Sequence, residues 1–361
     1  MSRPTRAIID IPAFVENYRH ARSLTRGARA VAVIKADAYG HGAVVLAKAL
    51  SGTADAFGVA CIEEAMELRE SGITDDIVLL EGIFEPHELI DVTREHLTQV
   101  VHCAEQLQWV LEASPARPYR VWLKLDSGMH RLGFEPDAFR AAFTALKACA
   151  HVGEIVLMSH FSRADEVDND RTRDQFALFQ RLTADLDCPI SVANSPAVLA
   201  WPATHGDWIR PGIMLYGASP MGRETPTADP LRPVMRLESA VIAVRTLATG
   251  EPIGYGGRFT CDRPTRVGVV AIGYGDGYPR HAIDGTPVAI DGVRSRIIGR
   301  VSMDMLTVDL TPVQHAGPGS RVELWGPRVS ANTVARHSDT IAYELFTGVT
   351  RRVPRLYQSP A

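Results

Sequence analysis

Eight short apolar runs, separated by amphipathic stretches, constrain the fold of the first two thirds of this 361-residue chain. Each run is continuously apolar rather than alternating, which is typical of parallel strands buried on both faces. The expected strands cover residues 28–35, 55–61, 76–82, 97–101, 119–126, 154–161, 188–194 and 207–217. Helix start and stop signals lie between them, such as Pro86 before one helical stretch and Gly72 after another.

This alternation predicts an α/β fold whose N-terminal part, residues 1–230, is a (β/α)8 barrel of the TIM type. A doubly wound open sheet is the alternative, but no G-x-G-x-x-G motif follows the first strand, which disfavours its dinucleotide-binding form. From about Leu231 the chain consists of β-branched runs broken by Gly, Pro, Asp and Asn. We therefore expect a smaller, mainly β domain over residues 231–361, joined through the proline-containing stretch 218–233.

Composition excludes several classes of function. Hydrophobic residues make up 46% of the chain and charged residues 22%, and the net charge of −4 is spread without a basic stripe, so we expect no nucleic-acid partner. No apolar stretch is long enough to span a bilayer, and the N-terminus lacks a secretory signal pattern, so we expect a cytoplasmic protein without membrane contacts. The five cysteines are widely spaced, and neither C-x-x-C nor H-E-x-x-H occurs, so we expect reduced thiols and no metal.

The barrel prediction gives meaning to polar residues at the strand ends, where the active sites of such barrels lie. These residues are Lys35, Lys124, Asp126, His160, Asn194, Ser195 and Arg210. Phosphates frequently bind after the seventh and eighth strands, where Ser195 offers a hydroxyl and Gly212 allows close approach of backbone N–H groups. A lysine able to form a Schiff base near a phosphate site indicates pyridoxal 5'-phosphate. The alternatives are a solvated lysine and an ordinary helix N-cap at Asn194.

Nine segments, in order and across both expected domains, resemble the motifs of alanine racemases, which are fold-type III pyridoxal-phosphate enzymes. They are AVIKADAYGHG (32–42), KLDSGMHRLGF (124–134), SHFSRADE (159–166), ANSPA (193–197), RPGIMLYG (210–217), GYGGRFT (254–260), GYGDGYPR (273–280), GRVSMDMLTVDL (299–310) and YEL at Tyr343. The resemblance covers nearly the whole chain and is closest to the proteobacterial branch. It implies a homodimeric racemase of L- and D-alanine with shared active sites, supplying D-alanine for peptidoglycan or feeding alanine catabolism.

The resemblance also implies roles for individual residues. Lys35 would carry the cofactor and act as one catalytic base, and Tyr255, delivered by the partner subunit, would be the other. The residues implied to bind pyridoxal phosphate are Lys35, Tyr39, His160, Asn194, Ser195, Arg210, Gly212, Ile213 and Tyr343. Arg131, and Met303 of the second subunit, would contact the substrate carboxylate. Lys124 matches a lysine that is carbamylated in many members of the family, where the carbamate would hold Arg131 in place.

These roles agree with the chemistry of racemisation, which removes the α-proton from one face of the substrate and returns a proton to the other. Two bases on opposite faces do this without turning the substrate over. Cations near Tyr255, such as Arg131, would favour the phenolate that can act as a base. Arg210 can only donate hydrogen bonds, so it would keep the pyridine nitrogen unprotonated and suppress side reactions.

Several alternatives remain open at the level of sequence. Tyr255 lies in a glycine-rich turn where an aromatic residue need not be catalytic, and His160 can be a core histidine. Tyr274 and Asp276 in GYGDGY are expected to shape a turn, and the alternative is that this loop lines the entrance of the site. The alternative functions are a racemase of serine or lysine, a barrel-type amino-acid decarboxylase, and a non-catalytic pyridoxal-phosphate carrier. A carrier would lack the second domain, and a decarboxylase would be expected to place a cysteine-centred motif in the site.

Overall fold

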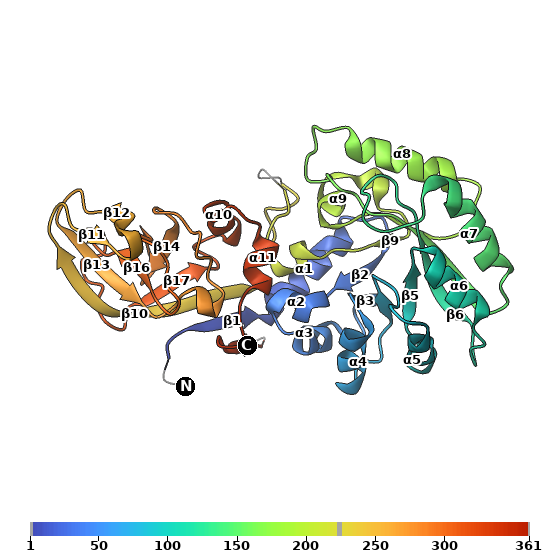
Figure 1. The fold of residues 1–361 in the computed structure, drawn as a ribbon, viewed down its shortest axis with the longest axis horizontal. Coiled ribbons are helices and arrows are strands. Elements are labelled where there is room, and N and C mark those ends of the chain that lie inside the picture. Colours follow the sequence, from blue (N-terminus) through green and yellow to red (C-terminus); the bar gives the residue numbers. More distant parts are fainter. Residues whose placement is uncertain (1–2, 222–225, 360–361) are drawn as a thin grey trace.

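The computed structural model describes residues 3–221 and 226–359, so part of the expected linker at 218–233 lies outside the described residues. Figure 1 shows an elongated molecule with a barrel at one end and a mainly β domain at the other. Helix α11 (Ala342–Thr347) lies at the junction and packs against α2 (Lys35–Gly40) of the barrel. The second domain therefore contributes to the end of the barrel that carries Lys35.

The eight predicted barrel strands form one parallel sheet in the order β8-β7-β6-β5-β4-β3-β2-β9. They are β2 (Arg29–Val33), β3 (Ala56–Val59), β4 (Ile77–Leu79), β5 (Thr98–Val101), β6 (Tyr119–Lys124), β7 (Val152–Met158), β8 (Ile190–Ser191) and β9 (Trp208–Ile209). The two edge strands meet just beyond their ends, where the Arg210 N–H donates to the Ala193 carbonyl at 2.9 Å. The sheet is a nearly closed barrel, so the predicted fold class is confirmed.

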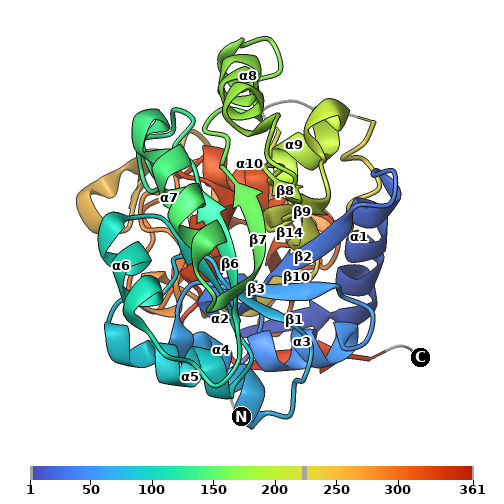
Figure 2. The same ribbon diagram turned by 90° about the vertical axis from the view of Figure 1, so that its right-hand side faces the viewer.

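Helices surround these strands, as the view from the barrel end in Figure 2 shows. They are α1 (Ile11–Ser23), α2, α3 (Ala43–Leu50), α4 (Ile62–Glu70), α5 (Leu89–Arg94), α6 (Ala104–Glu112), α7 (Pro136–Ala148), α8 (Arg171–Thr183) and α9 (Ser195–Ala200), with 3-10 turns η1 (Pro86–Glu88), η2 (Pro202–Thr204) and η3 (Ile213–Tyr216). Local sequence sets where they begin. In α1, for example, the Asp10 carboxylate accepts a hydrogen bond from the Ala13 N–H at 2.9 Å, and Pro12 occupies the first turn, where a missing N–H has no cost.

The inside of the barrel is filled by side chains. One cluster of buried residues takes a member from most strands: Val31, Ala56, Val78, Val100, Trp122, Val156, Met158 and Trp208. The rings of Trp122 and Trp208 lie 5.6 Å apart. Alternate residues such as Phe57 and Leu123 belong instead to the large core that includes the surrounding helices. Because the barrel interior is a packed core and not a pore, a ligand can bind only at its mouth.

The second domain is built on an eight-stranded sheet around the long strand β10 (Met235–Leu247), which pairs with β1, β13 and β17. The other strands of this sheet are β1 (Arg6–Asp10), β13 (Thr265–Val270), β14 (Pro287–Ile290), β15 (Val293–Arg296), β16 (Leu306–Asp309), β17 (Arg321–Trp325) and β18 (Arg355–Gln358). Strands β11 (Pro252–Ile253) and β12 (Phe259–Thr260) form a separate hairpin. Short helical elements complete the domain: η4 (Tyr255–Gly257), η5 (Tyr274–Asp276), α10 (Ala331–Arg336) and α11.

Strand β1 belongs to this second sheet, whereas the expected division at residue 230 placed these residues with the barrel. It runs antiparallel to β10 and parallel to β18, so both ends of the chain join the β domain. Ala7 and Ile9 of β1 are fully buried. Residues 6–10 therefore add a strand to the sheet of the β domain.

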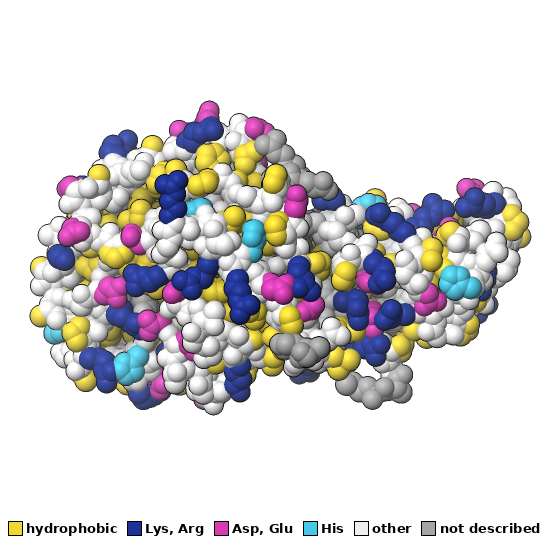
Figure 3. All heavy atoms as spheres, turned by 180° about the vertical axis from the view of Figure 1, so that it is seen from behind, with side chains coloured by type: hydrophobic (Ala, Val, Ile, Leu, Met, Phe, Trp, Pro, Cys, Tyr) yellow, Lys and Arg dark blue, Asp and Glu magenta, His cyan; other side chains and the backbone are white. Residues whose placement is uncertain are grey.

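The surface carries charges of both signs. On the face shown in Figure 3, basic and acidic side chains are interspersed, and no continuous basic stripe crosses that face. Among the described residues, none of the helices has the length and apolar character needed to cross a membrane. In the same part of the chain, no group of His, Cys, Asp and Glu side chains is arranged to hold a metal ion.

Candidate active site

Lys35 lies two residues after the end of β2 and begins α2, a turn that winds in the left-handed sense. The φ angles of Ala36, Asp37, Ala38 and Tyr39 are all 51° or 52°. This conformation costs roughly 1–2 kcal/mol for each residue with a Cβ. Strain of this kind persists only where the surrounding structure holds it, and it is concentrated at functional sites.

A hydrogen bond to a neighbouring helix and hydrogen bonds within the turn itself hold it in place. The Glu64 carboxylate, from α4, accepts from the Ala36 N–H at 2.7 Å. His41 is fully buried, and burial lowers its pKa to about 4. Its Nδ1 lies 2.9 Å from the Tyr39 carbonyl and 3.1 Å from that of Ala38; since a carbonyl can only accept, Nδ1 carries the proton. The turn that displays Lys35 is therefore fixed before any ligand binds.

A cavity of about 720 Å³ opens at the mouth of the barrel beside this turn. The predicted site residues that line it are Lys35, Tyr39, Lys124, Arg131, His160, Asn194, Ser195, Arg210, Gly212, Ile213 and Tyr343. Tyr343 comes from α11 of the β domain and the others come from the barrel. Residues up to about 300 positions apart in the sequence thus meet around one opening.

Hydroxyl and backbone N–H groups gather on one side of the cavity. The Ser195 Oγ accepts from the Gly212 N–H at 2.8 Å, which leaves the hydroxyl hydrogen to be donated to a ligand. A Cβ at Gly212 would lie 2.7 Å from the Tyr39 hydroxyl, so only glycine allows this close packing. Burial raises the pKa of Tyr39 to about 12 and also raises that of Tyr343, so both phenols are neutral donors. Within the described residues neither hydroxyl makes a hydrogen bond. This set of donors suits a phosphate.

Arg210 is buried at the floor of the cavity. Its guanidinium donates to the Ser191 hydroxyl and the Ser159 carbonyl, both at 2.6 Å. Burial lowers the pKa of Arg210 to about 9, which still leaves it charged at neutral pH. Burial and the charge of Arg210 lower the pKa of His160 well below its usual 6.5, so the imidazole is neutral. Nη2 of Arg210 lies 3.4 Å from Nδ1 of His160, and the Asn194 amide lies 3.3 Å from Nε2.

Lys124 is a buried lysine, only 6% exposed, at the end of β6. Burial, together with the positive charges of Arg210, Arg131 and Lys35, lowers the pKa of Lys124 to about 8. In the described part of the chain its amine makes no hydrogen bond. A neutral amine, or a modification that adds negative charge, would relieve this crowding of cations.

Glu81 is a residue that sequence reasoning missed. Its Oε1 lies 3.8 Å from the Lys35 Nζ, and it lines the cavity. It follows β4 as Lys35 follows β2, so the strand-end criterion that selected Lys35 could also have selected Glu81. Ile341, Glu344 and Thr347, in or beside α11, also line the cavity and were not predicted.

Tyr255 and Met303 are not among the described residues that line the cavity. Tyr255 begins η4, between β11 and β12, which Figure 1 places at the end of the molecule remote from the barrel. Tyr255 is 70% exposed and Met303 is 53% exposed. The turn of Tyr255 is nevertheless anchored, because the adjacent Arg258 donates to the Gly299 carbonyl at 3.0 Å. One chain by itself does not bring these two residues to the cavity.

Two family models match the chain: the N-terminal domain of alanine racemase over residues 9–220, and its C-terminal domain over residues 234–357. The chain belongs to the alanine racemase family. It is 59% identical over 355 residues to a catabolic alanine racemase of Pseudomonas aeruginosa, which covers 98% of this chain and 99% of that protein.

Solved structures agree. The biosynthetic alanine racemase from Pseudomonas aeruginosa superposes with a TM-score of 0.96 at 47% identity, covering 99% of this chain and 100% of that one. The alanine racemase from Bartonella henselae with covalently bound pyridoxal phosphate gives 0.89 at 30% identity, covering 98% and 99%. Catabolic and biosynthetic enzymes thus both stand among the similar proteins.

The comparisons confirm the predicted family and an isomerase acting on amino acids. The match of the second domain to the alanine racemase C-terminal model argues against a carrier, which would lack that domain. It equally argues against a barrel decarboxylase. The family is one of pyridoxal-phosphate enzymes.

Proposed function

We propose that this chain interconverts L-alanine and D-alanine with pyridoxal 5'-phosphate bound covalently to Lys35, as a homodimer with shared active sites. The observation that carries the proposal is the single cavity at the barrel mouth. It gathers a lysine amine, a neutral imidazole, a buried guanidinium and neutral hydroxyl donors. The covalently bound cofactor in the Bartonella henselae structure supports it.

The cavity fits this cofactor in chemical terms. Tyr39, Ser195 and Tyr343 would donate their hydroxyl groups to the phosphate. Gly212 and Ile213 would lie against it with their backbone, where the Gly212 N–H already donates to the Ser195 Oγ. His160 would lie beside the ring, supported by Asn194, and Arg210 would face the pyridine nitrogen. When bound, the cofactor supplies an electrophilic carbonyl for the substrate amine and an electron-withdrawing ring that acidifies the α-proton.

The protein groups then move the proton between the two faces of the α-carbon. The Lys35 amine, fixed by the left-handed turn, would exchange a proton on one face. Tyr255 of the partner subunit would exchange a proton on the other. Arg131 at the rim of the cavity, and Met303 of the partner subunit, would hold the substrate carboxylate. Because the substrate is held between two bases, protons are exchanged on both faces without rotation of the substrate.

Exposed side chains on the β domain support the shared site. Tyr255, Tyr274, Met303 and Met305 are exposed there, and Ile341 is exposed beside the cavity. Exposed apolar side chains that gather in one patch are typical of surfaces that a partner covers. We propose that residues 231–361 form a domain that completes the partner's site, while residues 1–230, together with Tyr343 of α11, hold the cofactor.

Lys124 is in a state that favours carbamylation, because only a neutral amine reacts with carbon dioxide. With a pKa of about 8, about a tenth of this amine is neutral at pH 7, against less than about a thousandth for an ordinary lysine. The resulting anion would lie among Lys35, Arg131 and Arg210, and would offer Arg131 an acceptor. We propose that this modification holds Arg131.

We also propose a cytoplasmic location. All five cysteines are free, as expected in a reducing compartment.

The function is tested with the purified protein supplied with pyridoxal phosphate. We expect racemisation of both alanine enantiomers, exchange of the α-proton in heavy water, and a borohydride-reduced cofactor adduct on Lys35 in peptide maps. Serine and lysine, tested in parallel, should react at least about tenfold more slowly, since each extra group must fit a site built for a methyl. A protein that binds no cofactor, or an adduct on another lysine, contradicts the proposal.

A further inference from the structure

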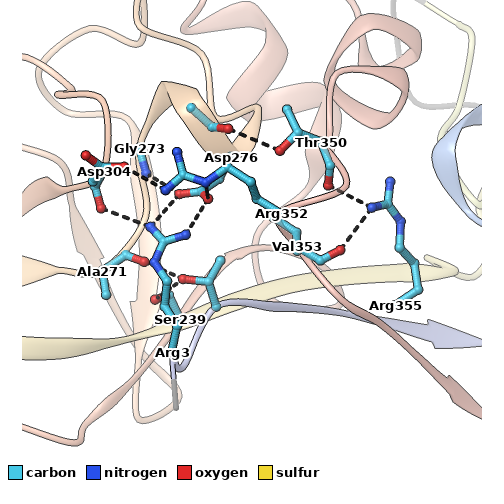
Figure 4. A network of polar contacts seen from close by, with 12 residues as sticks. Arg3, Ser239, Ala271, Gly273, Asp276, Asp304, Thr350, Arg352, Val353 and Arg355 are labelled. Carbon is cyan, nitrogen blue, oxygen red and sulfur yellow. Dashed lines mark hydrogen bonds and ion pairs between the residues drawn. The ribbon is translucent and has the colours of Figure 1, made fainter. Parts of the chain in front are cut away.

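A buried carboxylate in the β domain lies between two arginines from distant parts of the chain (Figure 4). Nη2 of Arg3 donates to Oδ2 of Asp276 at 2.7 Å, and Nη1 pairs with Oδ1. Nε of Arg352 lies 3.4 Å from the same Oδ1. Asp276 is 0% exposed, so its charge is tolerated only because it is paired. From the sequence this residue was expected to shape a turn, with a loop at the site entrance as the alternative.

The same two arginines also reach the loop that carries Met303. Nη2 of Arg352 donates to the Asp304 carboxylate at 2.6 Å, and Nη2 of Arg3 donates to the Asp304 carbonyl at 3.2 Å. Each arginine therefore links Asp276 to the residue that follows Met303 (Figure 4).

Backbone contacts join the two loops directly. The Gly275 N–H donates to the Met303 carbonyl at 2.8 Å. A Cβ at Gly273 would overlap backbone atoms of Ser302 and Met303, so the loops can touch only at a glycine. Oδ2 of Asp276 in turn accepts from the Gly273 N–H at 3.0 Å. The Asp276 side chain thus fixes the turn against which Met303 rests.

The network continues toward the cofactor end of the same chain. The Thr350 N–H donates to the Asp276 carbonyl at 3.1 Å. Arg355 donates to the Thr350 carbonyl at 2.8 Å and to the Gly40 carbonyl at 3.2 Å. Gly40 ends the turn that begins at Lys35. Asp276 could therefore influence its own barrel as well as its loop, and an experiment has to separate the two.

Resting on the proposed function, we propose that Asp276 is a positioning residue which, through Arg3 and Arg352, holds Met303 in place for the active site of the partner subunit. The side chains of Met303 and Asp304 are exposed, and the arginines that bind Asp304 are themselves partly exposed. Exposed ion pairs by themselves contribute little to stability. The buried carboxylate of Asp276 is the fixed point from which both arginines are oriented.

The place of Asp276 behind the loop of Met303 predicts which kinetic parameter changes when Asp276 is substituted. Met303 would contact the substrate carboxylate, so a loosened loop weakens substrate binding. Asp276, Arg3 and Arg352 are not among the described residues that line the cofactor cavity. In Asp276→Asn we therefore expect KM for alanine to rise about tenfold or more, kcat to change by less than about threefold, and the affinity for pyridoxal phosphate to stay the same.

Glu238→Gln is the matched control. Glu238 is also a buried carboxylate of the β domain paired with arginines, namely Arg6, Arg236 and Arg321. A general loss of stability would affect both variants, whereas the KM effect should appear only in Asp276→Asn. Arg352→Gln, at a partly exposed side chain, serves as a second variant if Asp276→Asn does not fold, with an expected rise in KM of about threefold.

Mixed dimers separate action on the partner from action on the same chain. Asp276→Asn subunits are mixed with Lys35→Ala subunits, which lack the amine but keep an intact β domain. The working site of the mixed dimer then combines the intact barrel of one subunit with the intact β domain of the other, so we expect a wild-type KM. A KM that stays raised, or an Asp276→Asn homodimer with a normal KM, overturns the inference.

A parallel mixture, with Tyr255→Phe in place of Asp276→Asn, identifies which idea has failed. Recovery with Tyr255→Phe but not with Asp276→Asn overturns only the role of Asp276. If neither mixture recovers, the active sites are not shared, and both the shared site and the role of Asp276 are contradicted. An inactive wild-type protein overturns the proposed function itself.

Discussion

The barrel half and the β-domain half of the candidate site differ in how they are held. In the barrel, Ser195, Arg210 and Lys124 are buried, and the first two are fixed by hydrogen bonds to neighbouring strand ends. In the β domain, Tyr255 and Met303 are exposed on loops. Those loops are anchored from behind by arginines, Arg258 for Tyr255 and the Asp276 network for Met303.

This difference indicates that the two halves of the site have different roles. A buried, hydrogen-bonded cavity is already organised within one chain and can hold a cofactor there. Exposed groups on anchored loops become a site only when a second surface covers them. Substitutions at barrel residues that line the cavity should therefore affect cofactor binding. Substitutions at Tyr255 or in the loop of Met303 should instead affect turnover or substrate binding while the cofactor stays bound.

The largest effects should come from Lys35→Ala and Tyr255→Phe, which differ in whether the cofactor stays bound. Each removes one proposed base, so each should lower kcat by at least about 10³-fold. Only Lys35→Ala should also lose the covalently bound cofactor, seen as loss of its absorbance after gel filtration. The proposed difference between the two halves is contradicted if Tyr255→Phe loses the cofactor, or if it keeps more than about a tenth of wild-type activity.

Ser195→Ala should produce a smaller effect, confined to the barrel half. The substitution removes the acceptor for the Gly212 N–H and one donor to the phosphate. A hydrogen bond to a charged group contributes about 1.5–3 kcal/mol, so the dissociation constant for pyridoxal phosphate should rise about tenfold or more. Titration of cofactor fluorescence measures this change. Ser338→Ala, at a buried serine of the β domain that donates to the Val334 carbonyl, should leave the constant unchanged.

Lys124 should give a pH-dependent effect on stability. Its pKa of about 8 in the folded protein lies below the ordinary 10.5, so the buried ammonium destabilises the fold below pH 8, by about 3 kcal/mol. This cost disappears between pH 8 and 10.5, where the unfolded chain binds more protons. In buffer free of carbon dioxide, Lys124→Met should therefore be more stable than wild type at pH 7, and the difference should shrink toward pH 10.5.

Denaturant unfolding at several pH values measures this difference. Lys48→Met, at an exposed lysine of α3, should show no such trend. A Lys124→Met protein whose advantage is the same at pH 7 and pH 10 would show that Lys124 is not buried as a charged amine.

The sequence predicted much of the fold because a parallel barrel has a local signature. Strands buried on both faces must be continuously apolar, and the eight runs have this property. Strand β1 lacked such a signal, since its place depends on pairing with β10 and β18, far away in the sequence. The left-handed turn was also not predicted, because Ala36 to Tyr39 have no preference for it. It is held by a tertiary hydrogen bond to Glu64 and a local one from His41 to the Tyr39 carbonyl.

The candidate site was predicted unevenly for similar reasons. Residues at strand ends could be chosen because barrel geometry brings those ends together. Glu81 follows the same rule, two residues after β4, but was not among the predicted site residues. The Asp276 network joins residues 273 positions apart, so its existence depends on the N-terminal segment and the turn η5 meeting in space. No pattern within GYGDGY indicates it.

Mixing Lys35→Ala with Tyr255→Phe subunits tests the central claim most directly, namely that one site combines the barrel of one chain with the β domain of another. Both homodimers should be inactive. After dissociation and reassociation, the mixed dimer contains one barrel with Lys35 facing an intact Tyr255, so we expect about half of wild-type activity per mixed dimer, measured as α-proton exchange of L- and D-alanine. No recovery of activity, in mixed dimers that have demonstrably formed, would contradict the account.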